Sequence, residues 1–137
     1  MKFLVLNGPN LNLLGKREPG VYGTGTYAGL CAEIAAYAAA RGIRADIRQS
    51  NHEGVLIDEI QAADGVYDGI VINPGAYTHY SYAIYDALLA VRVPAVEVHI
   101  SDISRREAFR GQIVGHGFRG YLEAMELLEN IHKEDMK

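Results

Sequence analysis

Gly69–Leu89, GIVINPGAYTHYSYAIYDALL, is the stretch that decides the fold. The β-branched run 70–72 predicts a buried strand. The following Asn-Pro-Gly at 73–75 ends it, because proline lacks an N–H and glycine permits a sharp reversal. Next comes a predicted helix, with Thr78 or Ser81 as N-cap and a buried face made of Ala83, Ile84, Ala87 and Leu88. Ligands of open α/β sheets bind at such strand-to-helix corners, so this corner is a candidate site.

The composition indicates an ordinary globular protein. The chain has 137 residues and a formal net charge of −4, which argues against a nucleic-acid or anionic-membrane partner. Its length predicts one domain, 1–137, around one substantial core. Residues 1–4 run directly into a strand without a signal peptide, and no apolar run approaches the roughly 18 residues of a membrane span. We therefore expect a cytoplasmic protein.

Strands and helices alternate along the chain. Strands are predicted at 2–6, 43–49, 70–72, 95–100 and 112–114, with helical spacing in most of the segments between them. This alternation predicts an α/β fold, a parallel sheet with helices on both faces. The favoured strand order is 2-1-3-4-5, a flavodoxin-like three-layer sandwich with a five-stranded parallel sheet.

In that order the loops after strands 1, 3 and 4 converge. The polar residues expected around the resulting pocket are Asn10, Asn73, His79, Glu97, His99 and Ser101. The loop 15–25, GKREPGVYGTG, is long and rich in glycine and proline. Such a loop in a compact domain is typically a lid or a binding loop. We expect it to cover the pocket.

Glu97 and His99 are two residues apart on a predicted strand, so their side chains share a face. A carboxylate beside an imidazole can orient it for acid–base catalysis. The alternative is a structural ion pair at a strand end. Directly beyond, the N–H groups of Ile100 and Ser101 form a candidate carboxylate-binding turn, for which plain helix capping is the alternative.

Three cationic or phenolic residues complete the candidate site. In the loop, Arg17 could favour the phenolate form of Tyr22, whose ordinary pKa is about 10; solvated loop residues are the alternative. Arg110 could reach a ligand hydroxyl or carboxylate, or lie on the surface.

Two other kinds of site are disfavoured. A metal site formed by His79, Glu97 and His99 lacks any HxH or HExxH spacing. The segment 115–120, GHGFRG, matches GxGxxG literally. It lies too near the end of the chain for the βαβ unit that a dinucleotide site needs.

Motifs in order along nearly the whole chain resemble those of the type II 3-dehydroquinate dehydratases. They are Asn7–Gly15, Arg17–Pro19, Tyr22–Gly23, Gln49–Gly54, Asn73–Ala76, Thr78–His79, Asp86–Ala87, Glu97–Ser101, Arg106–Glu107, Phe109–Arg110 and Gly120–Tyr121.

The resemblance implies anti elimination of water from 3-dehydroquinate, giving 3-dehydroshikimate in the shikimate pathway, without metal, cofactor or Schiff base. Tyr22 would be the base that removes the C2 proton, with Arg17 favouring its phenolate. The resulting enolate would be stabilised through a water held near Asn10.

The same resemblance assigns the acid and the binding groups. His99 would protonate the departing C1 hydroxyl, oriented by Glu97 and helped by Asn73. The groups implied in substrate binding are the N–H groups of Ile100 and Ser101 for the carboxylate, and His79 and Arg110 for the ring hydroxyls.

The resemblance also implies a homo-oligomer, because Asp86 matches an acid that a neighbouring subunit contributes, and family members form trimer-based dodecamers. The competing hypothesis is a non-catalytic module that binds a small anion on the same fold.

Three departures from the family pattern stand out. Family members usually have further residues between Arg110 and Gly111, where this chain passes almost directly from a predicted helix at 101–110 into its last strand. Either residues have been lost or the closing strand is displaced. Tyr85 stands where arginine is common. Asp102 replaces the usual asparagine and adds a negative charge near the expected carboxylate site.

Overall fold

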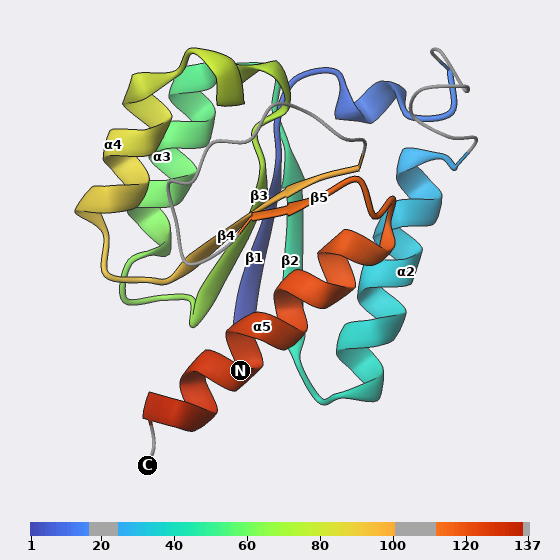
Figure 1. The fold of residues 1–137 in the computed structure, drawn as a ribbon, viewed down its shortest axis with the longest axis vertical. Coiled ribbons are helices and arrows are strands. Elements are labelled where there is room, and N and C mark those ends of the chain that lie inside the picture. The colour runs from blue at the N-terminus through green and yellow to red at the C-terminus, as the bar shows by residue number, and fades with distance from the viewer. Residues whose placement is uncertain (17–24, 101–111, 136–137) are drawn as a thin grey trace.

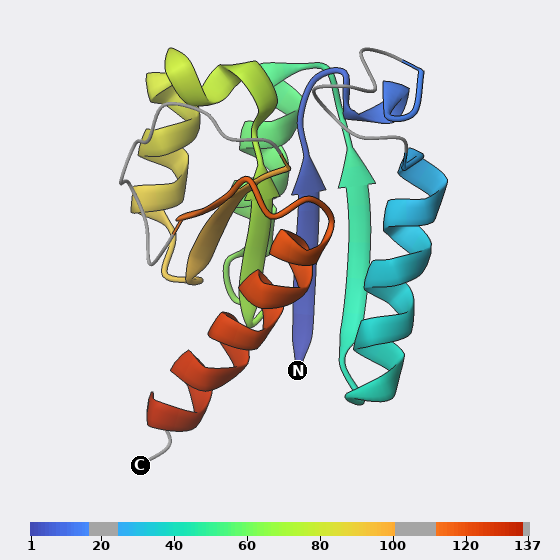
Figure 2. The same ribbon diagram turned by 45° about the vertical axis from the view of Figure 1, so that its right-hand side comes forward.

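The computed structural model describes residues 1–16, 25–100 and 112–135. Its strands form one parallel sheet in the order β2-β1-β3-β4-β5, which confirms the predicted fold class. The strands are β1 (Lys2–Asn7), β2 (Arg44–Gln49), β3 (Gly69–Asn73), β4 (Ala95–His99) and β5 (Gln112–Val114). Their parallel direction brings all their carboxyl ends to the same edge (Figure 2).

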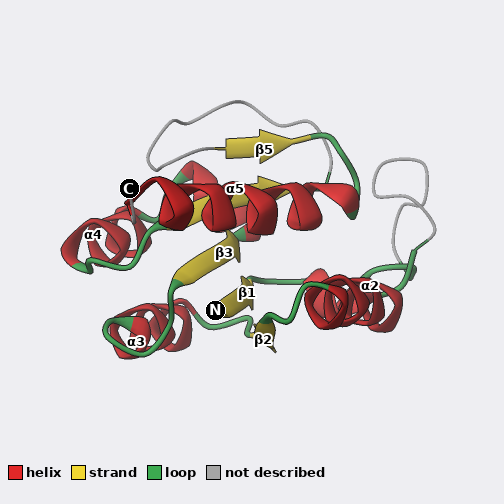
Figure 3. Cartoon of the chain, turned by 90° about the horizontal axis from the view of Figure 1, so that it is seen from below, coloured by secondary structure: helices red, strands yellow, loops and turns green. Residues whose placement is uncertain are grey.

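Helices cover both faces of the sheet (Figure 1). One face packs against α3 (Glu53–Ala63) and α4 (Tyr82–Ala90), and the other against α2 (Tyr27–Ala40) and α5 (Arg119–Asp135). Figure 3, which looks along the strands, shows α3 and α4 on the opposite side from α2. Two short 3₁₀ helices, η1 (Leu11–Leu13) and η2 (Gly75–His79), follow β1 and β3. The site-forming loops thus leave the sheet at its carboxyl edge.

Local signals explain where α2 and α4 begin and where α2 ends. The side chains of Thr26 and Ser81 cap α2 and α4 by accepting the N–H groups of Gly29 and Ile84. Gly42, with a φ of +66°, follows α2 in a left-handed conformation that suits glycine. Two backbone bonds, from Gly42 N to Ala39 O and from Ile43 N to Ala38 O, complete a Schellman motif there.

Strand alternation divides the core into two layers. On β1, Phe3 and Val5 face α2 and α5, whereas Leu4 and Leu6 face α3 and α4. Every residue of β3 and β4 is buried, as expected for central strands covered on both faces. The prediction for α4 was wrong at Ala83, which is exposed while Ile84, Ala87 and Leu88 are buried.

The closing strand is not displaced. β5 pairs with β4 through Glu97↔Gln112, Val98↔Ile113 and His99↔Val114, so it occupies the predicted edge position. The helix predicted at 101–110, the tight connection after it and most of the loop 15–25 lie outside the described residues. Within the described part of the chain, no helix is long and apolar enough to cross a membrane.

Candidate active site

The loops after β1 and β3 are held in backbone contact at the carboxyl edge. Gly8 N donates a 2.7 Å hydrogen bond to Asn73 O. A Cβ at Gly8 would lie 2.7 Å from the carbonyl carbon and oxygen of Pro74, closer than real Cβ atoms approach backbone. Glycine is therefore required here for the two loops to meet.

The loop that carries Asn10 is also tied to the end of β2. Asn10 has a left-handed φ of 68°, and its N–H donates to Asn51 Oδ1 at 3.0 Å. The side-chain amide nitrogen Nε2 of Gln49 donates to Gly8 O at 3.1 Å and to Asn51 Oδ1 at 3.0 Å. The Asn10 side chain is left exposed, where it is available to a ligand or water.

Glu97 and His99 come together as predicted. Both side chains point to the α3 and α4 face of β4, and Nε2 of His99 lies 3.3 Å from Oε1 of Glu97. Glu97 is 0% exposed and His99 5%. No described group forms a hydrogen bond with this buried Nε2. A buried imidazole beside a carboxylate, whose Nε2 lacks a hydrogen bond to any described residue, fits a functional rather than a purely structural group.

Hydroxyl groups from the β3–α4 corner hold the same carboxylate. Thr78, 1% exposed, donates its hydroxyl to Oε1 of Glu97 at 2.5 Å. Tyr85 brings its hydroxyl to 2.8 Å from the carbonyl oxygen of Thr78, 3.0 Å from Thr78 Oγ1 and 3.4 Å from Oε1 of Glu97. The departure from arginine at position 85 thus places a neutral phenol against this cluster.

The turn between β5 and α5 fixes the end of β4. Gly115 N donates to His99 O at 3.1 Å, and Gly117 N donates to Ile100 O at 3.0 Å. Both glycines have positive φ. The first two glycines of the 115–120 pattern therefore form a turn that secures the backbone of His99 and Ile100.

Asn73 lies on the other face of the sheet from Glu97. Its Nδ2 donates to the Tyr121 hydroxyl at 3.1 Å, and its Oδ1 accepts Gly75 N at 3.1 Å. The strand register explains this, because Ile72 pairs with Glu97 and the next residue must point the opposite way. The substrate-binding role of Asn73 stays a prediction.

Sequence reasoning missed the buried network around Tyr121. Its hydroxyl donates to Asn7 Oδ1 at 2.5 Å and accepts from Asn73, and Asn7 in turn donates to the Tyr27 hydroxyl at 3.5 Å. Burial raises the pKa of Tyr27 to about 12 and raises the pKa of Tyr121 as well. The available signal was a polar residue at the same register position of β1 and β3, Asn7 opposite Asn73.

Two further predicted residues at this corner are exposed. His79, the last residue of η2, is exposed, and Asp86 is exposed on α4. Asp86 shares its helix face with Tyr82 and Leu89, which are 73% and 70% exposed. The remaining predicted residues, Arg17, Tyr22, Ser101 and Arg110, lie outside the described residues.

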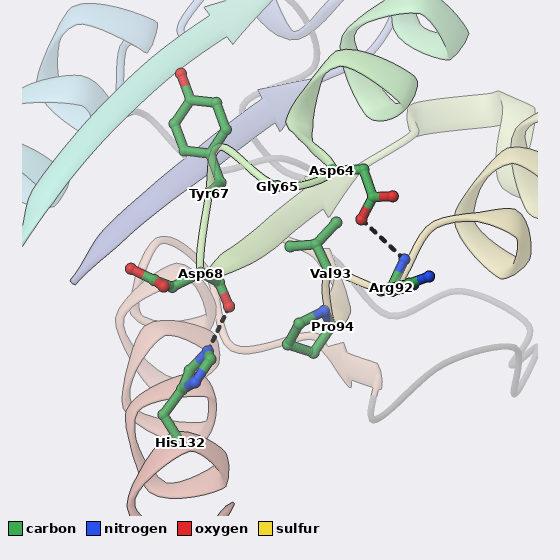
Figure 4. A pocket seen from close by; sticks show the side chains of 8 residues that line it. All are labelled: Asp64, Gly65, Tyr67, Asp68, Arg92, Val93, Pro94 and His132. Carbon is green, nitrogen blue, oxygen red and sulfur yellow. Dashed lines mark hydrogen bonds between the residues drawn. The ribbon is translucent and has the colours of Figure 1, made fainter.

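A separate hollow of about 400 Å³ opens at the opposite edge of the sheet (Figure 4). It lies between the segment before β3, the segment before β4 and α5, at the amino ends of the strands, away from the loops that carry the predicted site. Asp64 accepts Arg92 N at 3.1 Å, and His132 Nε2 bonds the carbonyl oxygen of Asp68. It is therefore not the predicted pocket. No group of three His, Cys, Asp or Glu side chains suited to a metal occurs among residues 1–16, 25–100 and 112–135.

Comparisons with known proteins agree on one family. The family described as Dehydroquinase class II matches residues 1–129. A 3-dehydroquinate dehydratase of Bacillus cereus is 50% identical, over 96% of this chain and 98% of the relative. The type II dehydroquinase structure from Butyrivibrio crossotus superposes with a TM-score of 0.90 at 50% identity, covering 94% of this chain and 97% of that one. The type II dehydroquinase from Propionibacterium acnes gives 0.85 at 40% identity, covering 93% and 96%.

Proposed function

This chain belongs to the class II dehydroquinase family, and we propose that it performs the 3-dehydroquinate dehydratase reaction by anti elimination through an enolate. The observation that carries the proposal is the buried pair formed by Glu97 and His99 at the carboxyl end of β4, with Nε2 3.3 Å from the carboxylate. A carboxylate in this place orients the imidazole as an acid.

The elimination is proposed to use protein side chains alone. Tyr22, as phenolate favoured by Arg17, removes the C2 proton, and the electrons move onto the C3 carbonyl oxygen to form an enolate. A water held near Asn10 stabilises this oxygen. Collapse of the enolate expels the C1 hydroxyl, which takes a proton from His99 and leaves as water, giving 3-dehydroshikimate.

Substrate binding is proposed to use groups on several loops. The carboxylate would be held by the N–H groups of Ile100 and Ser101, and the ring by Asn73, His79 and Arg110. The exposure of His79 supports a ligand-facing role, and the bond from Gly117 N to Ile100 O supports a fixed turn for the carboxylate.

We further propose that the chain forms a homododecamer built from trimers, in which Asp86 reaches the active site of a neighbouring subunit. The exposed face with Tyr82 and Leu89 supports this proposal. The chain is proposed to act as one domain in the cytoplasm, as a shikimate-pathway enzyme; the family match over residues 1–129 supports the single domain.

The test follows the conjugated enone product by its ultraviolet absorbance with purified protein and 3-dehydroquinate. Tyr22→Phe removes the base but little binding surface, so kcat should fall by about 100-fold or more while KM changes little. His99→Ala should also lower kcat strongly. Tyr67→Phe, at the opposite edge of the sheet, is the matched control and should keep the wild-type kcat.

A folded wild-type protein that forms no product would overturn the proposal. It would favour the alternative of a non-catalytic module that binds a small anion. Unchanged kcat in Tyr22→Phe would exclude Tyr22 as the base, and unchanged kcat in His99→Ala would exclude His99 as the acid.

A further inference from the structure

We infer that Thr78 is a positioning residue, whose buried hydroxyl holds the Glu97 carboxylate in the orientation that aligns His99 for proton transfer. This inference rests on the proposed acid role of His99. Thr78 itself is 1% exposed and acts through Glu97.

The oxygen that Thr78 binds is the one that faces His99. Oε1 of Glu97 accepts the Thr78 hydroxyl at 2.5 Å and lies 3.3 Å from Nε2 of His99. A carboxylate can rotate about its terminal bond, and that torsion is broad. A short hydrogen bond to Oε1 in a fully buried place restricts this rotation, so the Thr78 hydroxyl helps to set the distance from the carboxylate to the imidazole.

The protons available in the cluster define the direction of the bonds. Thr78 and Tyr85 each have one hydroxyl proton. The charged carboxylate is the strongest acceptor nearby, so the Thr78 proton goes to Oε1 of Glu97. Among the three contacts that the Tyr85 hydroxyl makes with described residues, the one to the carbonyl oxygen of Thr78 is the shortest at 2.8 Å, and we assign the Tyr85 proton to it. Tyr85 thereby fixes the backbone of Thr78 and helps to keep the Thr78 hydroxyl directed at Glu97.

The backbone around Thr78 is fixed as well. Thr78 belongs to η2, which ends at His79, two residues before the N-cap Ser81, and Ser81 N donates to Tyr77 O at 2.8 Å. Ser81 also donates its hydroxyl to Glu53 Oε2 at 2.6 Å, joining the corner to α3. The corner is therefore rigid enough to transmit a position to Glu97.

The decisive variant is Thr78→Val, which keeps the shape and removes the hydroxyl. With 3-dehydroquinate as substrate, kcat should fall by about tenfold or more, because the hydrogen bond to the charged Glu97 is lost. KM should change by less than about threefold, because no contact with the substrate is removed. Thr78→Ser restores the hydroxyl and should recover kcat to within about threefold of the wild type. Tyr85→Phe keeps the bond from Thr78 to Glu97 and should lower kcat less than Thr78→Val does.

Ser81→Ala is the matched control, since it removes a buried hydroxyl from the same corner that does not contact Glu97. It should lower the thermal unfolding temperature and lower kcat much less than Thr78→Val does, because the Thr78 hydroxyl keeps its bond to Glu97. Circular dichroism verifies that each variant is folded.

An unchanged or raised kcat in folded Thr78→Val overturns the inference, as does failure of Thr78→Ser to recover activity. If Thr78→Val is poorly folded, Tyr85→Phe and Thr78→Ser decide: wild-type kcat in Tyr85→Phe together with a tenfold loss in Thr78→Ser overturns the inference. His99→Ala separates the two claims. A normal kcat there overturns the acid role, whereas loss in His99→Ala with normal kcat in Thr78→Val overturns only the role of Thr78.

Discussion

At the scale of single residues, the Tyr121 hydroxyl connects two strands at the carboxyl edge of the sheet. It joins Asn7 at the end of β1 to Asn73 at the end of β3, deep in the protein. A tyrosine in this place satisfies one acceptor and one donor that the strands cannot pair with each other. The β1 and β3 loops of the site start from these two asparagines.

We expect Tyr121→Phe to lower the free energy of unfolding by about 1–3 kcal/mol at pH 7, because two buried amide groups lose their partner. The difference in unfolding free energy between the wild type and Tyr121→Phe should narrow as the pH rises above about 10. Burial raises the pKa of Tyr121 in the folded state, so the unfolded chain releases this proton first. The wild type therefore loses this stabilisation in alkali, whereas the variant has no such proton. Urea unfolding at pH 7 and at pH 10.5 measures both free energies.

Tyr27→Phe provides the comparison for that experiment. Tyr27 is partly buried and its hydroxyl accepts a long 3.5 Å bond from Asn7, so its removal should cost less than that of Tyr121. Equal losses in the two variants would contradict the central place of Tyr121 in the network.

At the scale of elements, the turn between α3 and β3 is fastened to the edge strand β2. The Tyr67 hydroxyl donates a 2.6 Å bond to Oδ2 of Asp46 on β2. This hydrogen bond is the main reason why the pKa of Asp46 lies below its ordinary value. Asp46 also has Arg44 beside it, at 3.4 Å. The edge strand, which is only partly buried, thus gains a contact from outside the sheet.

Tyr67→Phe should lower the free energy of unfolding by about 1 kcal/mol at pH 7. Since the folded pKa of Asp46 is lowered, the stabilisation is present above the unfolded pKa of about 4 and is lost as the pH falls through the folded value. The gap between wild type and Tyr67→Phe should therefore shrink below pH 4. Denaturant unfolding from pH 7 to pH 2.5 tests this, and a constant gap would show that Asp46 is not responsible.

At the scale of the whole molecule, the outer face of α4 bears on the proposed assembly. Tyr82, Asp86 and Leu89 lie one and two turns apart on this face, and all three side chains are exposed. Large apolar side chains gathered around a carboxylate are expected to lie at an interface in solution. Asp86 would then belong to the site of the neighbouring chain.

Leu89→Glu should place a charge in this interface and shift the protein to a species of smaller mass in light scattering, with lower kcat because Asp86 leaves its neighbour. Val66→Glu, at the exposed turn after α3, introduces the same charge outside α4 and should keep the wild-type mass. Equal mass for Leu89→Glu and the wild type would place the interface elsewhere.

Local patterns were sufficient for much of this protein. The alternation of buried strands and amphipathic helices predicted the strand order, and the spacing of Glu97 and His99 predicted their shared face. Caps at Thr26 and Ser81, and the glycine after α2, act within a few residues of their own position. Such features follow from the sequence because the forces that produce them are short in range.

Only the tertiary structure decided which distant groups meet. The pairing of Ile72 with Glu97 turns Asn73 away from His99 and toward Tyr121, which is 48 residues further along the chain. The same packing brings the Thr78 hydroxyl onto the Glu97 carboxylate. The register between strands and the seating of helices on them depend on the simultaneous burial of both faces of the sheet, a condition that no local stretch of sequence contains.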